Sequence, residues 1–387
     1  MTKVIVVGGG AAGLMAGLTA ARNGAETILF ERMPEPGRKM RITGKGGRVF
    51  PASGRAQDVV NTLVDAFVRA GGRLETNTQV TGFVMQPGKV TGVRFCRVKD
   101  NGRKAGQDFR SQVQRDVKLG PEHTLAADAV IVCAGGASYP GTGSDGNFVP
   151  VLKKMGVAVE PLLPALVYLQ PEDGFIEELE GLALKNIEAC ILADGKPVAK
   201  EFGELQILRG TLAGPVCLTL SRKTAQLVQH GAQELELSLD LKPALNEEKL
   251  QARLLRDLQD SGKKTLGEVV RGVVPQPLVE PLLDRVFLAA DKTVSQVTKK
   301  DRLALVQALK HFTIPLLGTG SLAEAIVTAG GVSLKEIDPK TMAAKRFRGL
   351  YFAGEVIDVD GYTGGFNLQA AFSTGYVAGL HAAQQKT

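Results

Sequence analysis

The sequence predicts an α/β fold in which a Rossmann-like domain with a parallel sheet is interrupted by an inserted β-rich, barrel-like domain and a helical subdomain. Three stretches carry this prediction, because each is a short apolar strand followed by glycines: residues 3–31, 127–136 and 348–371. An open parallel sheet binds its ligand outside the carboxyl ends of its strands. Three glycine-rich strand ends therefore predict one extended binding site.

The first stretch reads as strand, glycine turn, helix and strand. Val4–Val7 is a β-branched run typical of a buried strand, and a GxGxxG motif follows where a helix begins. Such glycines permit a tight turn, close approach of a pyrophosphate, and close packing of helix on strand. The residues that we expect to bind the dinucleotide here are Gly8, Gly10, Ala11, Ala12 and Gly13.

Glu31 ends the second strand, residues 27–30, eighteen residues after Gly13. An acidic side chain at this place binds the ribose hydroxyls of an adenosine and repels the 2′-phosphate of NADP. The motif therefore indicates FAD or NAD and does not choose between them.

Composition indicates an ordinary globular protein. The chain has 387 residues, 44% hydrophobic and 22% charged, which suits two or three domains. The N-terminal apolar run is about five residues long, against roughly 18 for a membrane helix, and no signal-peptide pattern follows, so we expect a cytoplasmic protein. The four cysteines form no CxxC pair, which argues against disulfides and a metal site: Cys96, Cys133, Cys190 and Cys217.

The net charge of +7 raises the question of a nucleic-acid partner. The basic residues are scattered, however, and the chain has no Trp and only 5 Tyr with which to stack bases. We therefore interpret the charge as a solvated basic surface that also attracts anionic cofactors.

Residues 32–48 form a basic, glycine-rich segment with two prolines, which cannot be regular. Arg38, Lys39 and Lys45, together with the glycine amides, either wrap a diphosphate or a flavin edge, or belong to a surface loop. A helix over 58–70 and a strand over 73–76 follow.

A hairpin is expected next, with strands 79–86 and 89–97 turning at Pro87-Gly88, and then a polar excursion over 99–121. Val80 in the first of these strands either touches an adenine or is an ordinary strand valine.

The second of the three glycine-rich stretches, residues 127–136, is a strand that ends in small residues. Small residues at this point allow a ligand to approach the backbone. Ser138 and Tyr139 follow and either face the reactive site or serve as turn residues. The third glycine-rich stretch, residues 348–371, repeats this pattern, because a strand ends at Gly354-Glu355. A second glycine pair, Gly364-Gly365, then opens a helix over 366–380. The first amides of that helix can face a second negative group of the same ligand.

Between these anchors the pattern changes. Strands are expected at 187–192, 216–220 and 234–239, helices at 247–258, 266–273, 277–286 and 300–309, and alternation again at 324–334. We therefore expect a dinucleotide-binding domain over 1–160 and 335–387, a β-rich substrate domain over 161–242 and 312–334, and a helical subdomain over 243–311.

The segments GGGAAG, GRKMRITGKG, VIVCAGGASYPGTGS and LYFAGEVIDVDGYTGGFNLQAAFSTGYVAG resemble the HI0933-like (BaiN/YhiN-like) family of FAD-dependent NAD(P)/FAD oxidoreductases. That family has the two-dinucleotide-binding-domain flavoprotein layout, and the resemblance covers nearly the whole chain. It implies FAD as cofactor, bound by the first glycine turn and by Glu31, Arg32, Arg38, Lys39, Met40, Thr43, Gly44, Val80, Ala134, Gly135, Gly136, Gly354, Glu355, Gly365, Phe366, Asn367 and Leu368.

Two departures from the family pattern stand out. Relatives continue from TGKG into an RCN-containing segment, whereas here Gly46 meets Gly47-Arg48 directly. Relatives also carry a Phe-Thr-His-like motif before the GLSGP turn, whereas this chain has Arg209 and Gly210 there and lacks that candidate substrate histidine.

The resemblance implies hydride transfer at the flavin N5, with negative charge at N1 and C2=O to be stabilised. The expected flavin-stabilising groups are the amides of Gly365, Phe366, Asn367 and Leu368. No acid or base is identified, because the four histidines are isolated: His123, His230, His311 and His381.

The leading hypothesis is an FAD-dependent oxidoreductase that transfers hydride between a small organic substrate, amine or enone-like, and the flavin. NADH or NADPH, as a transient co-substrate, or dioxygen would be the second partner, since no second complete nucleotide motif is found. The alternatives are an FAD-dependent tRNA-modifying protein and a flavin-binding protein without turnover. Nothing in the sequence specifies an oligomeric state.

Overall fold

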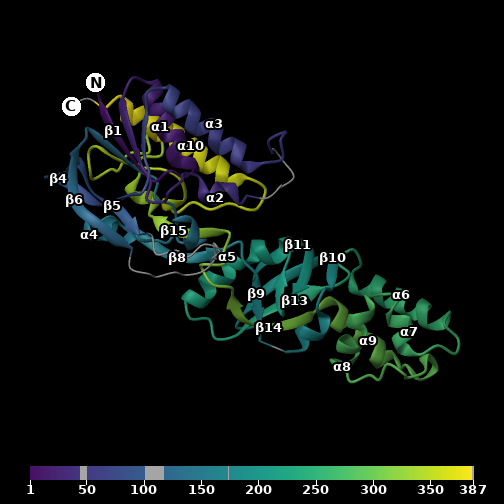
Figure 1. Cartoon of the computed structure of the whole chain (residues 1–387). Coiled ribbons are helices and arrows are strands. Elements are labelled where there is room, and N and C mark those ends of the chain that lie inside the picture. Colours follow the sequence, from purple (N-terminus) through teal and green to yellow (C-terminus); the bar gives the residue numbers. More distant parts are fainter. Residues whose placement is uncertain (44–49, 101–116, 173, 386–387) are drawn as a thin grey trace. The chain divides into compact units, whose positions relative to one another are not determined.

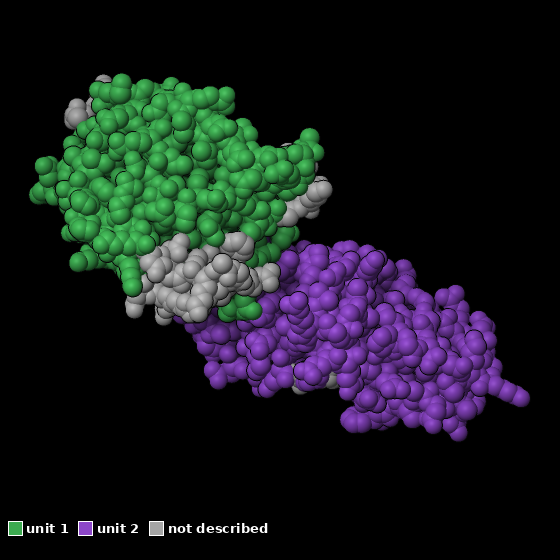
Figure 2. Space-filling model, viewed as in Figure 1, with its two compact units in different colours: residues 1–165, 321–387 green, residues 166–320 purple. Residues whose placement is uncertain are grey.

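The protein is described from a computed structural model, which describes residues 1–43, 50–100, 117–172 and 174–385 (Figure 1). The chain divides into two compact units (Figure 2). Unit 1 comprises residues 1–165 and 321–387, and unit 2 comprises residues 166–320. Among the described residues, no helix is both long enough and apolar enough to cross a membrane.

A five-stranded parallel sheet forms the centre of unit 1, in the order β16-β7-β1-β2-β3. Its strands are β1 (Lys3–Val7), β2 (Glu26–Phe30), β3 (Arg73–Glu75), β7 (Ala129–Val132) and β16 (Leu350–Phe352). The apolar runs that predict strands are buried as expected, and Ile5, Ile131 and Phe352 are fully enclosed. The chain leaves β1 toward β2 on one side while β7 lies on the other, so a topological switch point lies between β1 and β7.

Helices and a second sheet cover this central sheet. The helices are α1 (Ala11–Arg22), α2 (Arg38–Arg41), α3 (Ala56–Arg69), α4 (Val149–Lys154) and α10 (Phe366–Ala383). Figure 1 shows α1, α3 and α10 together on one side. An antiparallel sheet packs on the other side, and the rings of Phe95 in this sheet and Phe30 in β2 stack with centroids 4.8 Å apart.

This antiparallel sheet has the order β4-β5-β6, with β4 (Thr78–Gln86), β5 (Lys89–Asp100) and β6 (Lys118–Ala126). The expected hairpin is present. The expected polar excursion over 99–121 is wrong at its end, because β6 begins at Lys118 and pairs with β5. Most of β6 is exposed at the sheet edge, so it shows little of the apolar alternation that predicts a strand.

Strands β8 (Val159–Ala165) and β15 (Val327–Val332) form a separate antiparallel pair where the chain leaves unit 1 and returns to it. Residues 321–334 therefore belong to unit 1, whereas the sequence pattern places them with the β-rich domain. The alternation of 324–334 indicates a strand and carries no information about its partner.

Unit 2 contains a closed barrel in the order β10-β11-β12-β9-β14-β13. The strands are β9 (Leu169–Pro171), β10 (Ala183–Ala193), β11 (Lys196–Leu208), β12 (Thr211–Ala213), β13 (Leu235–Asp240) and β14 (Phe312–Thr319). The helices are α5 (Pro215–Gln229), α6 (Glu247–Gln259), α7 (Leu266–Val270), α8 (Val279–Asp284) and α9 (Lys299–Lys310).

The expected strand over 216–220 is wrong, because these residues open helix α5. Pro215 occupies the first turn, and Val216, Cys217 and Leu220 face the barrel core, a spacing that suits a helix. Barrel and helices share one hydrophobic cluster, which includes Leu237, Leu254 and Leu305.

Candidate functional site

The turn between β1 and α1 requires glycine at two positions. Gly8 has a φ of +101°, and a Cβ there would lie 2.4 Å from the carbonyl oxygen of Cys133. A Cβ on Gly13 would lie 1.8 Å from the carbonyl oxygen of Gly8. Strand and helix therefore approach more closely than any other residue allows, as the GxGxxG pattern predicts.

Gly10 has a different environment. No described residue lies within 4 Å of a Cβ built there, so the described part of the chain leaves space at the start of α1. Gly10 is the N-cap residue, no side chain caps the helix, and Ala11 and Ala12 form its first turn. The first amides of a helix carry partial positive charge, so this space suits an anionic group such as a pyrophosphate.

Glu31 lies beside this turn. One carboxylate oxygen accepts a hydrogen bond from the Gly9 N–H and the other from the Met33 N–H, both at 2.7 Å. Burial raises the pKa of Glu31, and the two N–H donors oppose that rise. Each oxygen keeps a second lone pair with which it can accept a hydrogen bond from a ribose hydroxyl.

The basic segment after β2 folds back onto the glycine turn, because the Gly37 N–H donates to the Gly9 carbonyl at 2.8 Å. Helix α2 follows, with Met40 buried and Thr43 just beyond its end. Arg32 pairs with Asp145 at 2.8 Å, and Arg38 is half-buried within α2. Gly44, Lys45 and the junction of Gly46 with Gly47 lie outside the described residues.

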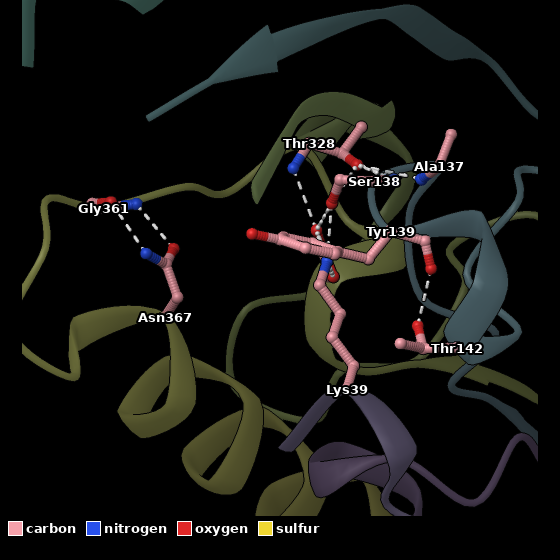
Figure 3. A network of polar contacts seen from close by, with 9 residues as sticks. Lys39, Ala137, Ser138, Tyr139, Thr142, Thr328, Gly361 and Asn367 are labelled. Carbon is pink, nitrogen blue, oxygen red and sulfur yellow. Dashed lines mark hydrogen bonds and ion pairs between the residues drawn. The ribbon is translucent and has the colours of Figure 1, made fainter. Parts of the chain in front are cut away.

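Lys39 is the centre of a polar network (Figure 3). Its Nζ lies 2.7 Å from both carboxylate oxygens of Glu355 and donates to Ser138 Oγ at 2.6 Å. Ser138 is fully buried and in turn donates to Glu355 at 3.1 Å. Two predicted cofactor residues more than three hundred positions apart thus meet in one ion pair.

Thr328 in β15 completes the network, and the sequence did not single it out. Its N–H donates to Glu355 at 2.9 Å, while its hydroxyl oxygen accepts the N–H groups of Ala137 at 2.8 Å and Ser138 at 3.1 Å. A Cβ on Gly136 would lie 2.3 Å from that hydroxyl. The sequence shows Thr328 only as a polar residue in an otherwise apolar strand. This pattern does not predict which residues Thr328 contacts.

The end of β7 has mixed surroundings. Gly136 packs against Thr328, whereas Gly135 has a φ of +75° and lies beside Ser144. The Ser144 hydroxyl is buried without a hydrogen-bond partner in the described part of the chain, so it can bind a ligand group. Ala134, which precedes Gly135 in the chain, is half-buried. Val80 lies in β4 and is 5% exposed.

The start of α10 resembles the start of α1. Gly364 and Gly365 have φ values of +105° and +93°, a Cβ on Gly365 would meet nothing within 4 Å, and no side chain caps the helix. Phe366 is 43% exposed, and Asn367 and Leu368 follow within the first turn. Helix α10 thus begins, like α1, at a glycine and without a side-chain cap among the described residues.

Helices α1 and α10 pack against each other and run in the same direction, because Gly375 lies beside Ala12 and Gly379 beside Ala16. A Cβ on Gly375 would lie 2.4 Å from the Ala12 carbonyl oxygen, and a Cβ on Gly379 would lie 2.3 Å from that of Ala16. Ala12 is the second residue of α1 and Gly375 the tenth of α10. Helix α10 therefore begins about eight residues earlier along the shared direction, or about 12 Å.

These features fit an extended dinucleotide. One uncapped helix start suits the pyrophosphate, and a second, displaced along the same direction, suits a group at the far end of the ligand. The four histidines lie in separate parts of the chain: His123 in β6, His230 just after α5, His311 just after α9 and His381 in α10. Within the described ranges no group of three acidic, His or Cys side chains could hold a metal ion. The individual cofactor contacts stay predictions.

Comparison with known proteins identifies the family of the chain. A model described as HI0933-like protein Rossmann domain matches residues 46–381, and one described as FAD dependent oxidoreductase matches residues 3–40. A 3-dehydro-bile acid delta(4,6)-reductase of Clostridium scindens is 27% identical over 422 aligned residues, with 100% of both chains covered.

Two further relatives are ribosomal RNA dihydrouridine synthases. The Escherichia coli protein is 27% identical and covers 96% of each chain, and the Haemophilus influenzae protein is 28% identical and covers 98%. The family model spans most of the chain, and these relatives align along nearly its full length. The chain therefore belongs to the HI0933-like family and is an FAD-dependent oxidoreductase.

Proposed function

We propose that this protein reduces a carbon–carbon double bond conjugated to a carbonyl group. The observation that carries the proposal is the reaction shared by full-length relatives with different substrates. A 3-dehydro-bile acid with double bonds at positions 4 and 6 is a conjugated enone. Dihydrouridine is uridine reduced at the bond conjugated to its C4 carbonyl. Both reactions add a hydride to one carbon and a proton to its neighbour.

Unit 1 would hold FAD along the two helix starts. The amides at Gly10 to Gly13 would bind the pyrophosphate, and Glu31 would accept hydrogen bonds from the adenosine ribose. When bound, FAD supplies reversible hydride transfer at N5. The amides of residues 365–368 would stabilise negative charge at N1 and C2=O in the reduced state, because the helix directs its positive end there.

The network of Lys39, Glu355, Ser138 and Thr328 would fix the wall of this site. Its donors and acceptors satisfy one another, so the Lys39 charge is neutralised by Glu355 at 2.7 Å. A neutralised and hydrogen-bonded network holds neighbouring backbone in place, as a preorganised site requires.

NADH or NADPH would deliver the hydride. The described residues contain one complete glycine motif with a terminal acid, and we assign that motif to FAD. The nicotinamide would therefore visit the flavin transiently rather than occupy a second nucleotide domain.

Anaerobic stopped-flow absorbance of the FAD-loaded protein tests this proposal. We expect NADH or NADPH to bleach the flavin, and a 3-oxo-4-ene steroid acid or a uridine-containing rRNA transcript to restore its absorbance faster than buffer does. Reoxidation by air alone, with no response to either acceptor, would identify an oxidase and contradict the proposal. No reaction with any donor or acceptor would indicate flavin binding without turnover.

Ribosomal RNA is the second candidate substrate, favoured by two relatives and by the net charge of +7. Binding through phosphates weakens steeply as salt increases. We expect an rRNA substrate to show such a salt dependence and to yield dihydrouridine, whereas turnover of a small enone would vary little with salt.

A further inference from the structure

The loop before α10 is fastened by a side chain of the helix itself. Asn367 Oδ1 accepts the Gly361 N–H at 2.8 Å, and Asn367 Nδ2 donates to the Gly361 carbonyl at 2.8 Å (Figure 3). Both contacts are partly buried. The side-chain amide thus pairs with both polar groups of one backbone residue, and this pairing fixes which atom of the amide is oxygen.

This contact closes a short ring that contains Gly364 and Gly365. Both glycines have positive φ, and a Cβ on Gly365 would touch nothing within 4 Å. Among the described residues, nothing would crowd a side chain at Gly365, and glycine has the greatest backbone freedom of any residue. The Asn367 contact limits that freedom.

The far end of the loop has its own anchor. The Asp358 N–H donates to the Val332 carbonyl at 3.0 Å, and the Asp358 carboxylate accepts the Gly330 N–H at 3.1 Å. Between Asp358 and Asn367 the loop is open to solvent at Val359, 42% exposed, and Tyr362, 62% exposed. Asn367 thus fastens the helix end of an exposed loop.

Asn367 is also the second residue of α10, so its own N–H is one of the first four amides, which have no partner within a helix. A side chain that capped the helix would occupy these amides. Here the Asn367 side chain bonds to Gly361 instead and does not cap the helix.

We propose that Asn367 is a positioning residue, whose side chain holds the Gly364-Gly365 turn so that the first amides of α10 face the flavin N1 and C2=O. This inference rests on the proposed placement of FAD. The Asn367 backbone amide would face the flavin, and the Asn367 side chain would hold that amide in place. The side chain is therefore predicted to affect the stability of negative charge on the flavin without contacting substrate.

The matched variants are Asn367→Asp and Gln369→Ala. The aspartate has the same shape and still accepts the Gly361 N–H, but it cannot donate to the Gly361 carbonyl, so two oxygens face each other. Gln369 is an exposed residue on the same helix, and its side chain donates to Ser373 at 3.0 Å. Its replacement removes a contact that does not involve the loop.

The first measurement is sulfite affinity of the FAD-loaded full chain, read from flavin absorbance. The sulfite adduct at N5 places negative charge at N1 and C2=O, so its stability reports on the facing amides. We expect Asn367→Asp to weaken sulfite binding about tenfold or more, the scale of one lost hydrogen bond plus repulsion. Gln369→Ala should match wild type.

The second measurement is hydrogen exchange of the full chain without added FAD, read by mass spectrometry. Peptides from 359–366 should exchange faster in Asn367→Asp, whereas peptides from α1 should not change. Unchanged exchange in the loop, or faster exchange with unchanged sulfite affinity, would overturn the inference. Wild-type protein that binds sulfite normally yet reduces no enone or uridine would contradict the proposed function alone.

Discussion

At the scale of single residues, the glycines of the first turn have opposite surroundings although the motif treats them alike. Gly13 would place a Cβ 1.8 Å from backbone, while Gly10 would place one in open space. The same motif therefore contains one residue required by the fold and one available for the ligand.

Alanine substitutions should separate these roles. We expect Gly13→Ala to lower the free energy of unfolding of the apoprotein by about 2–4 kcal/mol, because the backbone must shift. Gly10→Ala should stay within about 1 kcal/mol of wild type and weaken FAD binding about tenfold or more. Chemical denaturation measures the free energy of unfolding, and a flavin titration measures the affinity for FAD. Equal effects of the two variants on these quantities would contradict separate roles for Gly13 and Gly10.

Thr328 offers a second test at this scale. Thr328→Val keeps the shape but removes the acceptor for the N–H groups of Ala137 and Ser138. Unsatisfied buried donors cost about 1–3 kcal/mol, so we expect a loss of about 2 kcal/mol in denaturation. Thr62→Val, on the exposed face of α3, is the control and should change stability by less than about 0.5 kcal/mol.

At the scale of elements, the pairing of α1 with α10 sets the spacing between two open helix starts. The contact depends on Gly375 and Gly379, one helical turn apart, each facing a carbonyl oxygen of α1. Close backbone contact leaves no room for a side chain to adjust.

Gly375→Ala should therefore displace α10 along or away from α1. We expect about 1–3 kcal/mol of destabilisation from overpacking, with weaker FAD binding because the second helix start moves. Ser373→Ala, an exposed position on the same helix, is the control. A Gly375→Ala protein with normal stability and normal flavin affinity would show that the spacing is not fixed by this contact.

The contribution of Asp301, in the first turn of helix α9, to the free energy of unfolding should depend on pH. Lys292, at 2.8 Å, and the Thr298 N–H hold the pKa of Asp301 below its usual value. The stabilisation is present above the unfolded-state pKa of about 3.9 and is lost as pH falls through the lower folded-state pKa. We expect Asp301→Asn to cost roughly 1 kcal/mol near neutral pH and progressively less in acid, measured by denaturation. A cost that stays constant down to low pH would refute this.

At the scale of the whole molecule, every predicted FAD residue belongs to unit 1, although the chain leaves and re-enters that unit. Ala165 pairs with Val327, six residues after Ser321, so the two crossing points can be joined. A linker of about 15 Gly/Ser residues spans roughly 20 Å.

We expect a chain with residues 166–320 replaced by such a linker to bind FAD with an affinity within about tenfold of wild type. Equilibrium flavin titration measures this, with the Gly10→Ala version as the matched control. A folded unit 1 that binds no flavin would show that unit 2 contributes to the cofactor site.

Local patterns predicted most of the fold, because strand periodicity and glycine turns act over few residues. The first βαβ unit, the barrel-like insertion and the helices of unit 2 are examples. The strand expected at 216–220 was wrong because an apolar run of five residues does not distinguish a strand from a buried helix segment, and Pro215 was the better signal. The ion pair of Lys39 with Glu355, and the role of Thr328, depend on contacts between distant segments that no local pattern encodes.

The sheet order β16-β7-β1-β2-β3 also affects how the protein is made. Unit 2 is continuous in sequence and leaves the ribosome before β16 and α10 have been synthesised. Until then β7 is an open, fully apolar edge of the nascent sheet, which is the kind of edge that recruits wrong partners or chaperones. We therefore expect flavin loading to follow translation, because β16 completes the sheet and α10 supplies the second helix start of the proposed cofactor site.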